Sequence, residues 1–388
     1  MSVSVTKSGF NVREKLKQLQ KPIGLKGSEL MRAETVQDAR DLVSADRRNL
    51  IINGDFQVSQ RGTSATSISS DTYHTVDRWK FVGNSSGTFT LSKESDAPPG
   101  FSNSLKYLCT TADSSPSYLI CRQNIEGQNL QQLGYGTSSA KHITFSFWVK
   151  SNITGTYSLG LVNIDATYKN NSLYYTINSP GTWEYKTLTF NPDTSTGFDN
   201  DNELSMEVNW WLGSSSGYNG GSSTNGNWVN LTDSTRAGSA QVGTAVNNYW
   251  QIAGVQLEVG KNATEFEHRS YGEELALCQR YYQRMTNISS GTGRTFVVGS
   301  YNTTRAFGGF PLSHPMRVNP DVIWNNLRIE TLNLGSSAVV TDAFTYVSMP
   351  ESIAQPMEFN VASGLTAGTA YFISFSGTNS YIAFDAEL

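Results

Sequence analysis

The chain has 388 residues, enough to bury large cores and to form two or three domains. Aromatic residues make up 11% of it and charged residues only 16%, and Gly, Ser, Thr and Asn are abundant, a composition typical of short strands, frequent turns and a neutral polar surface. The formal net charge of -4 gives no reason to expect nucleic-acid binding across the whole chain, and no apolar run is long enough to predict a membrane-inserted helix.

The first 48 residues are basic and show helical periodicity. They hold ten Lys and Arg against six Asp and Glu, a net of +4, whereas the remaining 340 residues hold 19 against 27, a net of -8. Acidic residues interleave with the basic ones, which favours a docking segment for an acidic partner over a nucleic-acid or membrane tail.

Apolar spacing in this segment predicts two helices, over about 10–20 and 28–45. Neither helix can bury its apolar side alone, so residues 1–48 are predicted to form a helical anchor that docks on another protein or on copies of the chain. The candidate docking residues are Phe10, Val12, Leu16, Leu19, Leu30 and Leu42.

From Asn49 the periodicity changes to two, the repeat of a β-strand. Residues 142–150 and 204–212 alternate between two faces, which predicts one core face and one outer face for each strand. Trp148 and Trp211 fall on the outer faces. The predicted core positions are Ile143, Phe145, Phe147, Val149, Leu204, Met206, Val208, Trp210 and Leu212.

The number and spacing of strand-like segments predict a two-sheet antiparallel β-sandwich over residues 49–271. Between residues 213 and 246 runs a long Gly-, Ser-, Asn- and Thr-rich loop, whose aromatic residues favour an ordered, functional segment over a disordered one. The further predicted strands are 79–82, 88–93, 105–110, 117–123, 156–163, 173–178, 183–190 and 249–259.

A single linking helix is predicted over residues 272–285, where acidic residues precede basic ones as the helix dipole favours. Residues 286–388 return to strand patterns and predict a second, smaller β domain. The fold class is therefore mainly β, with a helical anchor at the N-terminus. Strands of the second domain are expected near 295–298, 322–324, 345–349, 369–375 and 381–384.

Signals for catalysis are weak, since the sequence contains no zinc-protease motif, P-loop or CxxC motif. A glycoside hydrolase would need paired carboxylates. The sequence favours a solvated turn over residues 199–203, so no enzyme is predicted. The carboxylates on offer are Asp199, Asp201, Glu203 and Glu207.

Sugar binding has a better physical basis. Saccharides stack their C–H faces on aromatic rings, and their hydroxyl groups bond to polar side chains. If the strands of Trp148 and Trp211 are neighbours, the two rings form one platform, with Lys150 among the polar groups around it; alternatively, the two rings pack under a loop or against another subunit. The predicted glycan-binding residues are Trp148, Glu207, Asn209, Trp211, Tyr218 and Trp228, the last two closing over the platform from the long loop.

An ordered set of phrases resembles phage tail-fibre or virion-fibre proteins of the marine cyanophage type, over about residues 49–285 and onward into 311–320. The resemblance implies a carbohydrate-binding jelly-roll domain, a homotrimer and an N-terminus docked on the phage tail, baseplate or capsid. The phrases are Asn49–Gly62, Asp77–Trp79, Phe145–Ser151, Gly181–Tyr185, Gly254–Gly260, Phe266–Tyr282 and Pro311–Pro320.

Some jelly rolls of this kind bind a structural calcium with an Asp on the last strand. Here Gly254 stands at that place, and Asp55 alone cannot supply the six or more oxygens that calcium prefers, so no cofactor or metal is predicted. The three cysteines, Cys109, Cys121 and Cys278, form no disulfide framework and are expected to be buried free thiols.

These observations together predict a virion fibre or spike subunit that docks through residues 1–48 and recognises host surface polysaccharide or lipopolysaccharide through its β domains. No secretion signal or lipidation motif is recognised, so release with assembled virions by lysis is expected. The first alternative is a structural virion protein without a receptor role, such as a capsid or baseplate fibre or decoration. The second alternative is a polysaccharide depolymerase.

Overall fold

The structure is a computed structural model that describes residues 48–165, 168–286, 292–331, 337–345 and 354–388. The predicted anchor helices lie outside this part of the chain, and so does most of the strand expected at 345–349. The candidate docking residues Phe10, Val12, Leu16, Leu19, Leu30 and Leu42 also lie outside it.

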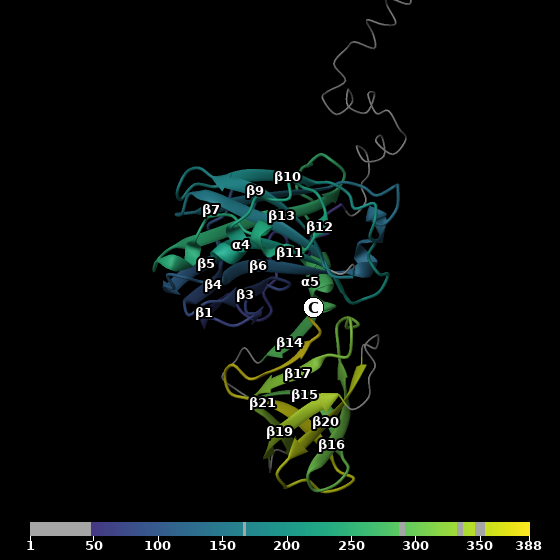
Figure 1. The fold of residues 1–388 in the computed structure, drawn as a ribbon. Helices are drawn as coiled ribbons and strands as arrows, with labels where there is room; N and C mark the ends of the chain where they lie inside the picture. Colours follow the sequence, from purple (N-terminus) through teal and green to yellow (C-terminus); the bar gives the residue numbers. More distant parts are fainter. Residues whose placement is uncertain (1–47, 166–167, 287–291, 332–336, 346–353) are drawn as a thin grey trace, which may run out of the picture. The chain divides into compact units, whose positions relative to one another are not determined.

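Residues Asn49–Leu388 form one unit that contains two separate hydrophobic cores, one in each of two antiparallel β domains (Figure 1). The two-sheet antiparallel β-sandwich predicted for the first domain is confirmed. Among the described residues, no helix is both long and apolar enough to cross a membrane.

One layer of the sandwich is a six-stranded sheet with the strand order β1-β4-β5-β13-β7-β10. All five strands predicted for this layer form within a residue or two of their expected ends, and the sequence did not indicate β1. The bounds are β1 Ser64–Ile68, β4 Thr88–Glu94, β5 Ser104–Thr111, β7 Ile143–Ser151, β10 Glu184–Phe190 and β13 Tyr249–Val259.

The other layer is a seven-stranded sheet with the order β12-β9-β8-β11-β6-β3-β2. The chain passes repeatedly from one sheet to the other, since β6 follows β5, β7 follows β6, and β11 follows β10. The bounds are β2 Thr72–Tyr73, β3 Lys80–Asn84, β6 Tyr118–Glu126, β8 Gly155–Asn163, β9 Lys169–Ile177, β11 Leu204–Ser214 and β12 Val229–Asn230.

The core between the sheets is aromatic, as the alternation on β7 and β11 predicts. The Trp210 ring lies 6.0 Å from the rings of Phe145 and Phe147, each nearly perpendicular to it, and all three side chains are fully buried. Because the two strands belong to facing sheets, their core residues interdigitate and their outer residues point in opposite directions.

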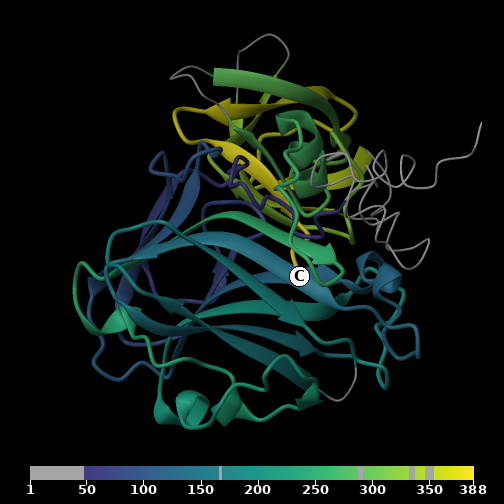
Figure 2. The ribbon, with the colours of Figure 1, turned by 90° about the horizontal axis from the view of Figure 1, so that it is seen from above.

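The long loop is ordered, as expected. It contains three short helices, α4 (Ser216–Asn219), η3 (Asp233–Thr235) and η4 (Val242–Thr244). Figure 2 shows α4, in teal-green, outside the strands of the sandwich. Two further short helices, η1 (Gly127–Asn129) and η2 (Gln131–Leu133), follow β6.

The predicted single helix over 272–285 is wrong in its second half. Helix α5 spans Tyr271–Gln279 and begins with a capping box between Ser270 and Glu273. Residues Tyr282–Thr286 instead form strand β14, because their backbone pairs with β22, at the other end of the sequence. Tertiary pairing of this kind overrides helical periodicity in a short segment.

The second domain combines a closed barrel, β15-β16-β20-β19-β18-β21, with a three-stranded sheet, β14-β22-β17. A β fold was predicted here, although the sequence did not indicate β14, β16, β18, β19 or β20. The bounds are β15 Thr292–Ser300, β16 Arg305–Pro311, β17 Asp321–Asn325, β18 Leu327–Thr331, β19 Ser337–Thr345, β20 Ala354–Val361, β21 Ala370–Ser376 and β22 Tyr381–Asp385.

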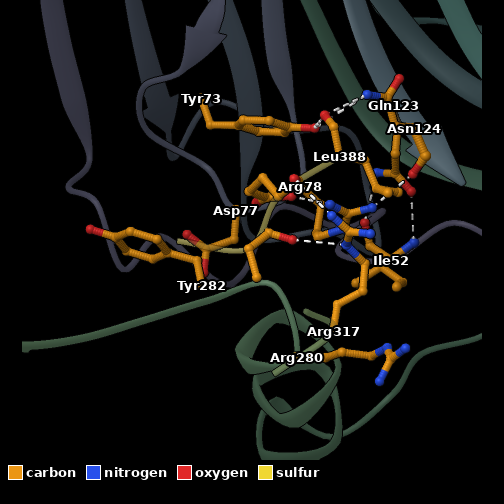
Figure 3. A network of polar contacts seen from close by, with 12 residues as sticks. Ile52, Tyr73, Asp77, Arg78, Gln123, Asn124, Arg280, Tyr282, Arg317 and Leu388 are labelled. Atoms are coloured by element: carbon orange, nitrogen blue, oxygen red, sulfur yellow. Dashed lines mark hydrogen bonds and ion pairs between the residues drawn. The ribbon is translucent and has the colours of Figure 1, made fainter. Parts of the chain in front are cut away.

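A buried polar network joins the two β domains (Figure 3). Arg78, with a side chain 1% exposed, pairs with Glu387, donates to the Asn124 carbonyl over 2.7 Å and lies 3.4 Å from the Tyr281 ring centroid. Arg317 of the second domain donates from Nη1 to the Asn202 carbonyl of the first domain over 2.7 Å. Buried charges need such pairing, so this network fixes the ends of both domains to each other.

Candidate functional site

The outer face of β11 carries three of the predicted glycan-binding residues, but the long loop covers its tryptophan. The Trp211 side chain is only 3% exposed, with the Tyr218 ring 5.4 Å away and the Arg236 guanidinium 5.1 Å from its ring centroid. Trp211 therefore packs under a loop, which is the alternative that the sequence left open.

Glu207 and Asn209 are occupied by one arginine. Arg122 donates to the Glu207 carboxylate and to the Asn209 side-chain oxygen, both over 2.6 Å. The recess beside Asn209, Trp211 and Arg236 has no room even for a water molecule, whereas the ligand pockets of proteins usually offer at least about 300 Å³.

Trp228 does not close over Trp211 as expected. Its ring lies 5.8 Å from Tyr135, and its Nε1 donates to the Asn191 carbonyl over 3.0 Å. Trp228 thus fastens the loop to the core of the sandwich.

The expected single platform of Trp148 and Trp211 is also wrong. Trp148 lies on β7 of the six-stranded sheet, whereas Trp211 lies on β11 of the seven-stranded sheet. The platform required the two strands to be neighbours, which they are not, and the core of the sandwich separates the two rings. Lys150 follows Trp148 to the outer face of the six-stranded sheet.

Trp148 instead belongs to an open aromatic cluster at the β7–β10 edge of its sheet, which we call the aromatic ledge: Trp148, Trp183 and Tyr185. The register places Tyr185 opposite Trp148, and their ring centroids are 5.3 Å apart. Tyr185 is 47% exposed, and both tryptophans are partly exposed. These rings are therefore accessible to solvent at the edge of the sheet.

Charged and polar groups border the aromatic ledge. Asp96 accepts hydrogen bonds from Lys150, from Trp183 Nε1 over 3.4 Å and from Gln251 Nε2 over 3.4 Å. The hydrogen bond from Lys150 holds the pKa of the Asp96 carboxyl below its ordinary value. Because the Lys150 Nζ also lies 4.9 Å from the Trp183 ring centroid, this pair fixes the orientation of that ring.

The turn before β10 is fixed by Glu184. Its carboxylate accepts from the backbone N–H groups of Asn178 and Ser179, each over 2.8 Å, and from Lys186 Nζ over 2.7 Å. Burial raises the pKa of this carboxyl, but the hydrogen bonds from Lys186, Ser179 and Asn178 outweigh burial and lower the pKa to about 2. The turn therefore presents Trp183 in a defined place.

A strap formed by residues 95–103 covers another part of the same sheet face. Its Phe101 ring lies 4.9 Å from Phe266 and 5.4 Å from His268. A Cβ atom added to Gly254, whose φ is +58°, would come within 2.3 Å of the Phe101 ring. The glycine therefore allows the strap to lie directly on β13.

Sequence reasoning found Trp148 and missed Trp183, Tyr185 and Asp96. The alternation of the predicted strand 183–190 already places Trp183 and Tyr185 on one face. Only the pairing of β10 with β7, which joins residues 37 positions apart in Tyr185↔Trp148, brings them to Trp148.

The other candidate residues sit in ordinary structural positions. Asp199, Asp201 and Glu203 are exposed in a turn before β11. Among the described residues no group of three or more His, Cys, Asp or Glu side chains could hold a metal ion, and the Asp55 carboxylate accepts from Gln57. The expectation of buried free thiols is confirmed for Cys109, Cys121 and Cys278.

No protein-family model matches the sequence, and no curated protein matches it. Among solved structures, the enzymatically active domain of tailspike protein 4 from bacteriophage CBA120 is 14% identical over 54% of this chain, with a TM-score of 0.31. The match spans about a fifth of that protein, 21%. A CBM4 structure is 12% identical over 53% of this chain and 97% of its own, with a TM-score of 0.30. TmCBM61 in complex with β-1,4-galactotriose is 10% identical over 56% of this chain and 100% of its own, with a TM-score of 0.27.

Proposed function

We propose that this chain is a virion fibre or spike subunit that binds host surface glycan, a polysaccharide or lipopolysaccharide, through the aromatic ledge. The observation that carries the proposal is the pair of rings Trp148 and Tyr185, 5.3 Å apart on the outer face of the sheet, with Tyr185 47% exposed. Exposed aromatic side chains that cluster on one face are typical of interaction sites.

The chemistry of the ledge suits a sugar. The C–H face of a pyranose stacks on the Trp148 and Tyr185 rings, while its hydroxyl groups bond to the exposed Asp96 carboxylate, which the buried Lys150 holds in place. Because the ledge is an open face, it accommodates an internal stretch of a polymer as well as an end. Each contact is modest, since a stacked aromatic pair is worth only about 0.5–1.5 kcal/mol beyond its burial.

Attachment to a particle would supply the missing affinity. Residues 1–48 carry a net charge of +4 and the rest of the chain -8, which supports a separate docking role for the N-terminal segment on the tail, baseplate or capsid. In a homotrimer, three weak sites act together, and their avidity exceeds the affinity of one site by orders of magnitude. The protein then reaches the cell surface as part of a virion released by lysis, and it binds without cleaving.

The test is retention of the purified full-length protein on host cells. Trp148→Ala/Tyr185→Ala is compared with wild type, and Tyr271→Ala, which removes an equally exposed ring from α5, is the matched control. We expect wild type and the control to be retained and the double variant to be lost while remaining folded by circular dichroism.

Three results would contradict the proposal in different ways. Wild type that is not retained at all would favour the structural virion protein. If the double variant were retained as well as wild type, the receptor would bind at a surface other than the aromatic ledge. Release of reducing ends from host polysaccharide would favour the depolymerase.

A further inference from the structure

The barrel presents an exposed aromatic side chain at the hairpin between β15 and β16, residues 301–304. Tyr301 is 66% exposed, the highest value among the large hydrophobic side chains that the structure describes. The hairpin lies at the lower end of the barrel in Figure 1, at the opposite end of β16 from Pro311.

An arginine accompanies this ring. The Arg305 guanidinium lies 5.4 Å from the Tyr301 ring centroid and 6.0 Å from that of Phe307, and the two rings meet edge to face at 5.9 Å. Within the described part of the chain, the guanidinium makes one ion pair, with Glu358 over 3.5 Å. The Arg305 side chain is 43% exposed, so further N–H donors face solvent beside the tyrosine.

The hairpin is held firmly for a surface loop. The Asn302 side-chain oxygen accepts from the backbone N–H groups of Thr304 and Arg305, over 2.8 and 2.9 Å. The neighbouring loop, residues 362–369, adds a bond from Leu365 N to the Thr303 carbonyl over 3.1 Å. A ligand that binds here meets side chains already in place, which lowers the entropic cost of binding.

We propose that Tyr301 and Arg305 form a second saccharide site, specific for a sugar that carries a negative charge. The tyrosine offers a stacking face to the C–H side of a pyranose, and the arginine offers paired N–H donors that match a carboxylate or a phosphate. The adjoining loop carries the exposed small polar residues Ser363 and Thr366, whose hydroxyl groups suit hydrogen bonds to a sugar.

This site is independent of the aromatic ledge, because it belongs to the other β domain and its separate core. The same barrel also supplies a matched comparison. Arg294 lies 5.4 Å from the Phe372 ring centroid and 3.6 Å from Glu330, the same combination of groups, but its ring carries no hydroxyl and is partly buried within the sheet.

The test measures binding of full-length protein to three charged sugars, each beside its neutral counterpart: trigalacturonate and galactotriose, sialyllactose and lactose, mannose 6-phosphate and mannose. Titration calorimetry gives the Kd, and ligand-observed NMR identifies the sugar face in contact. The variants are Tyr301→Ala and Arg305→Gln. The controls are Tyr301→Phe and Arg294→Gln, each checked for an unchanged midpoint of unfolding. Trp148→Ala, which removes a ring of the aromatic ledge, distinguishes binding at the ledge from binding at the hairpin.

We expect at least one charged sugar to bind wild type about tenfold more tightly than its neutral counterpart. Arg305→Gln should remove that preference, Tyr301→Ala should weaken binding about tenfold, the two controls should stay close to wild type, and Trp148→Ala should keep the preference for the charged sugar. No preference for any of the charged sugars would overturn the proposal. If Arg294→Gln lost the preference as fully as Arg305→Gln, the preference would be a general effect of charge and not a property of this site. If Trp148→Ala lost the preference, the charged sugar would bind at the aromatic ledge.

Discussion

Trp148 and Trp211 lie on the outer faces of opposite sheets, because the residues before them, Phe147 and Trp210, meet in the core with ring centroids 6.0 Å apart. The two outer tryptophans therefore serve different surfaces. Trp211 lies beneath the long loop, whereas Trp148 faces solvent beside Tyr185.

Trp211→Ala is expected to destabilise the protein. The ring is 3% exposed and packs with Val82, Ile120 and Ala237 under the loop, so its removal leaves a cavity. We expect the free energy of unfolding to fall by about 3 kcal/mol, measured by denaturant titration. A fall below about 0.5 kcal/mol would show that the loop does not depend on this ring.

Trp148→Ala should have the opposite profile. The ring is only partly buried, so the loss of stability should be about 1 kcal/mol, while retention on host cells should fall severalfold. The comparison uses the same denaturant titration together with a cell-binding assay. Full retention by Trp148→Ala, with loss of retention by Trp211→Ala at a temperature where both are folded, would contradict the assignment.

Gly254→Ala should loosen the strap. The glycine has a φ of +58°, and an added Cβ would come within 2.3 Å of the Phe101 ring, so strain and a clash act together. We expect a loss of about 2 kcal/mol or more and faster proteolysis within residues 95–103. Gly299→Ala is the control, because nothing lies within 4 Å of its added Cβ; equal effects in both variants would argue against the close approach of Phe101.

The contribution of Glu184 should depend on pH. Its pKa in the folded protein is about 2, below the ordinary value of 4.5, so its stabilising effect is complete above pH 4.5 and is lost as the pH falls toward 2. The free energy of unfolding of wild type should exceed that of Glu184→Gln at neutral pH, and the difference should shrink between pH 4.5 and pH 2. A difference that stays constant over this range would mean that the carboxylate is not held by these bonds.

Arg78→Met should uncouple the two β domains. The change removes the guanidinium but leaves the Glu387 carboxylate, whose side chain is 4% exposed, without its closest cation. We expect a loss of about 3 kcal/mol and a second transition in calorimetry as the domains unfold separately. Arg294→Met, which breaks the more exposed pair with Glu330, should cost less than about 1 kcal/mol; one cooperative transition in both variants would contradict the role of Arg78.

Local alternation and turn residues determined most of the sandwich from the sequence alone. In 142–150 and 204–212, every second position is apolar and must face the core to be buried. This alternation placed Phe147 and Trp210 correctly. The same pattern put Trp148 and Trp211 on outer faces, and it indicated strand β10, which carries Tyr185. These properties depend on neighbours within a few residues, so they can be predicted from the sequence.

The partner of each strand was decided only in the tertiary structure. A period of two predicts which side chains share a face, but it does not predict which sheet a strand joins. The two tryptophans that were expected to form one platform therefore lie on different sheets. Long-range pairing also turned Tyr282–Thr286 from predicted helix into β14 and placed Tyr185 beside Trp148. The free energy that selects those pairings comes from apolar surface buried between segments that are distant in the sequence. A local pattern therefore cannot predict it.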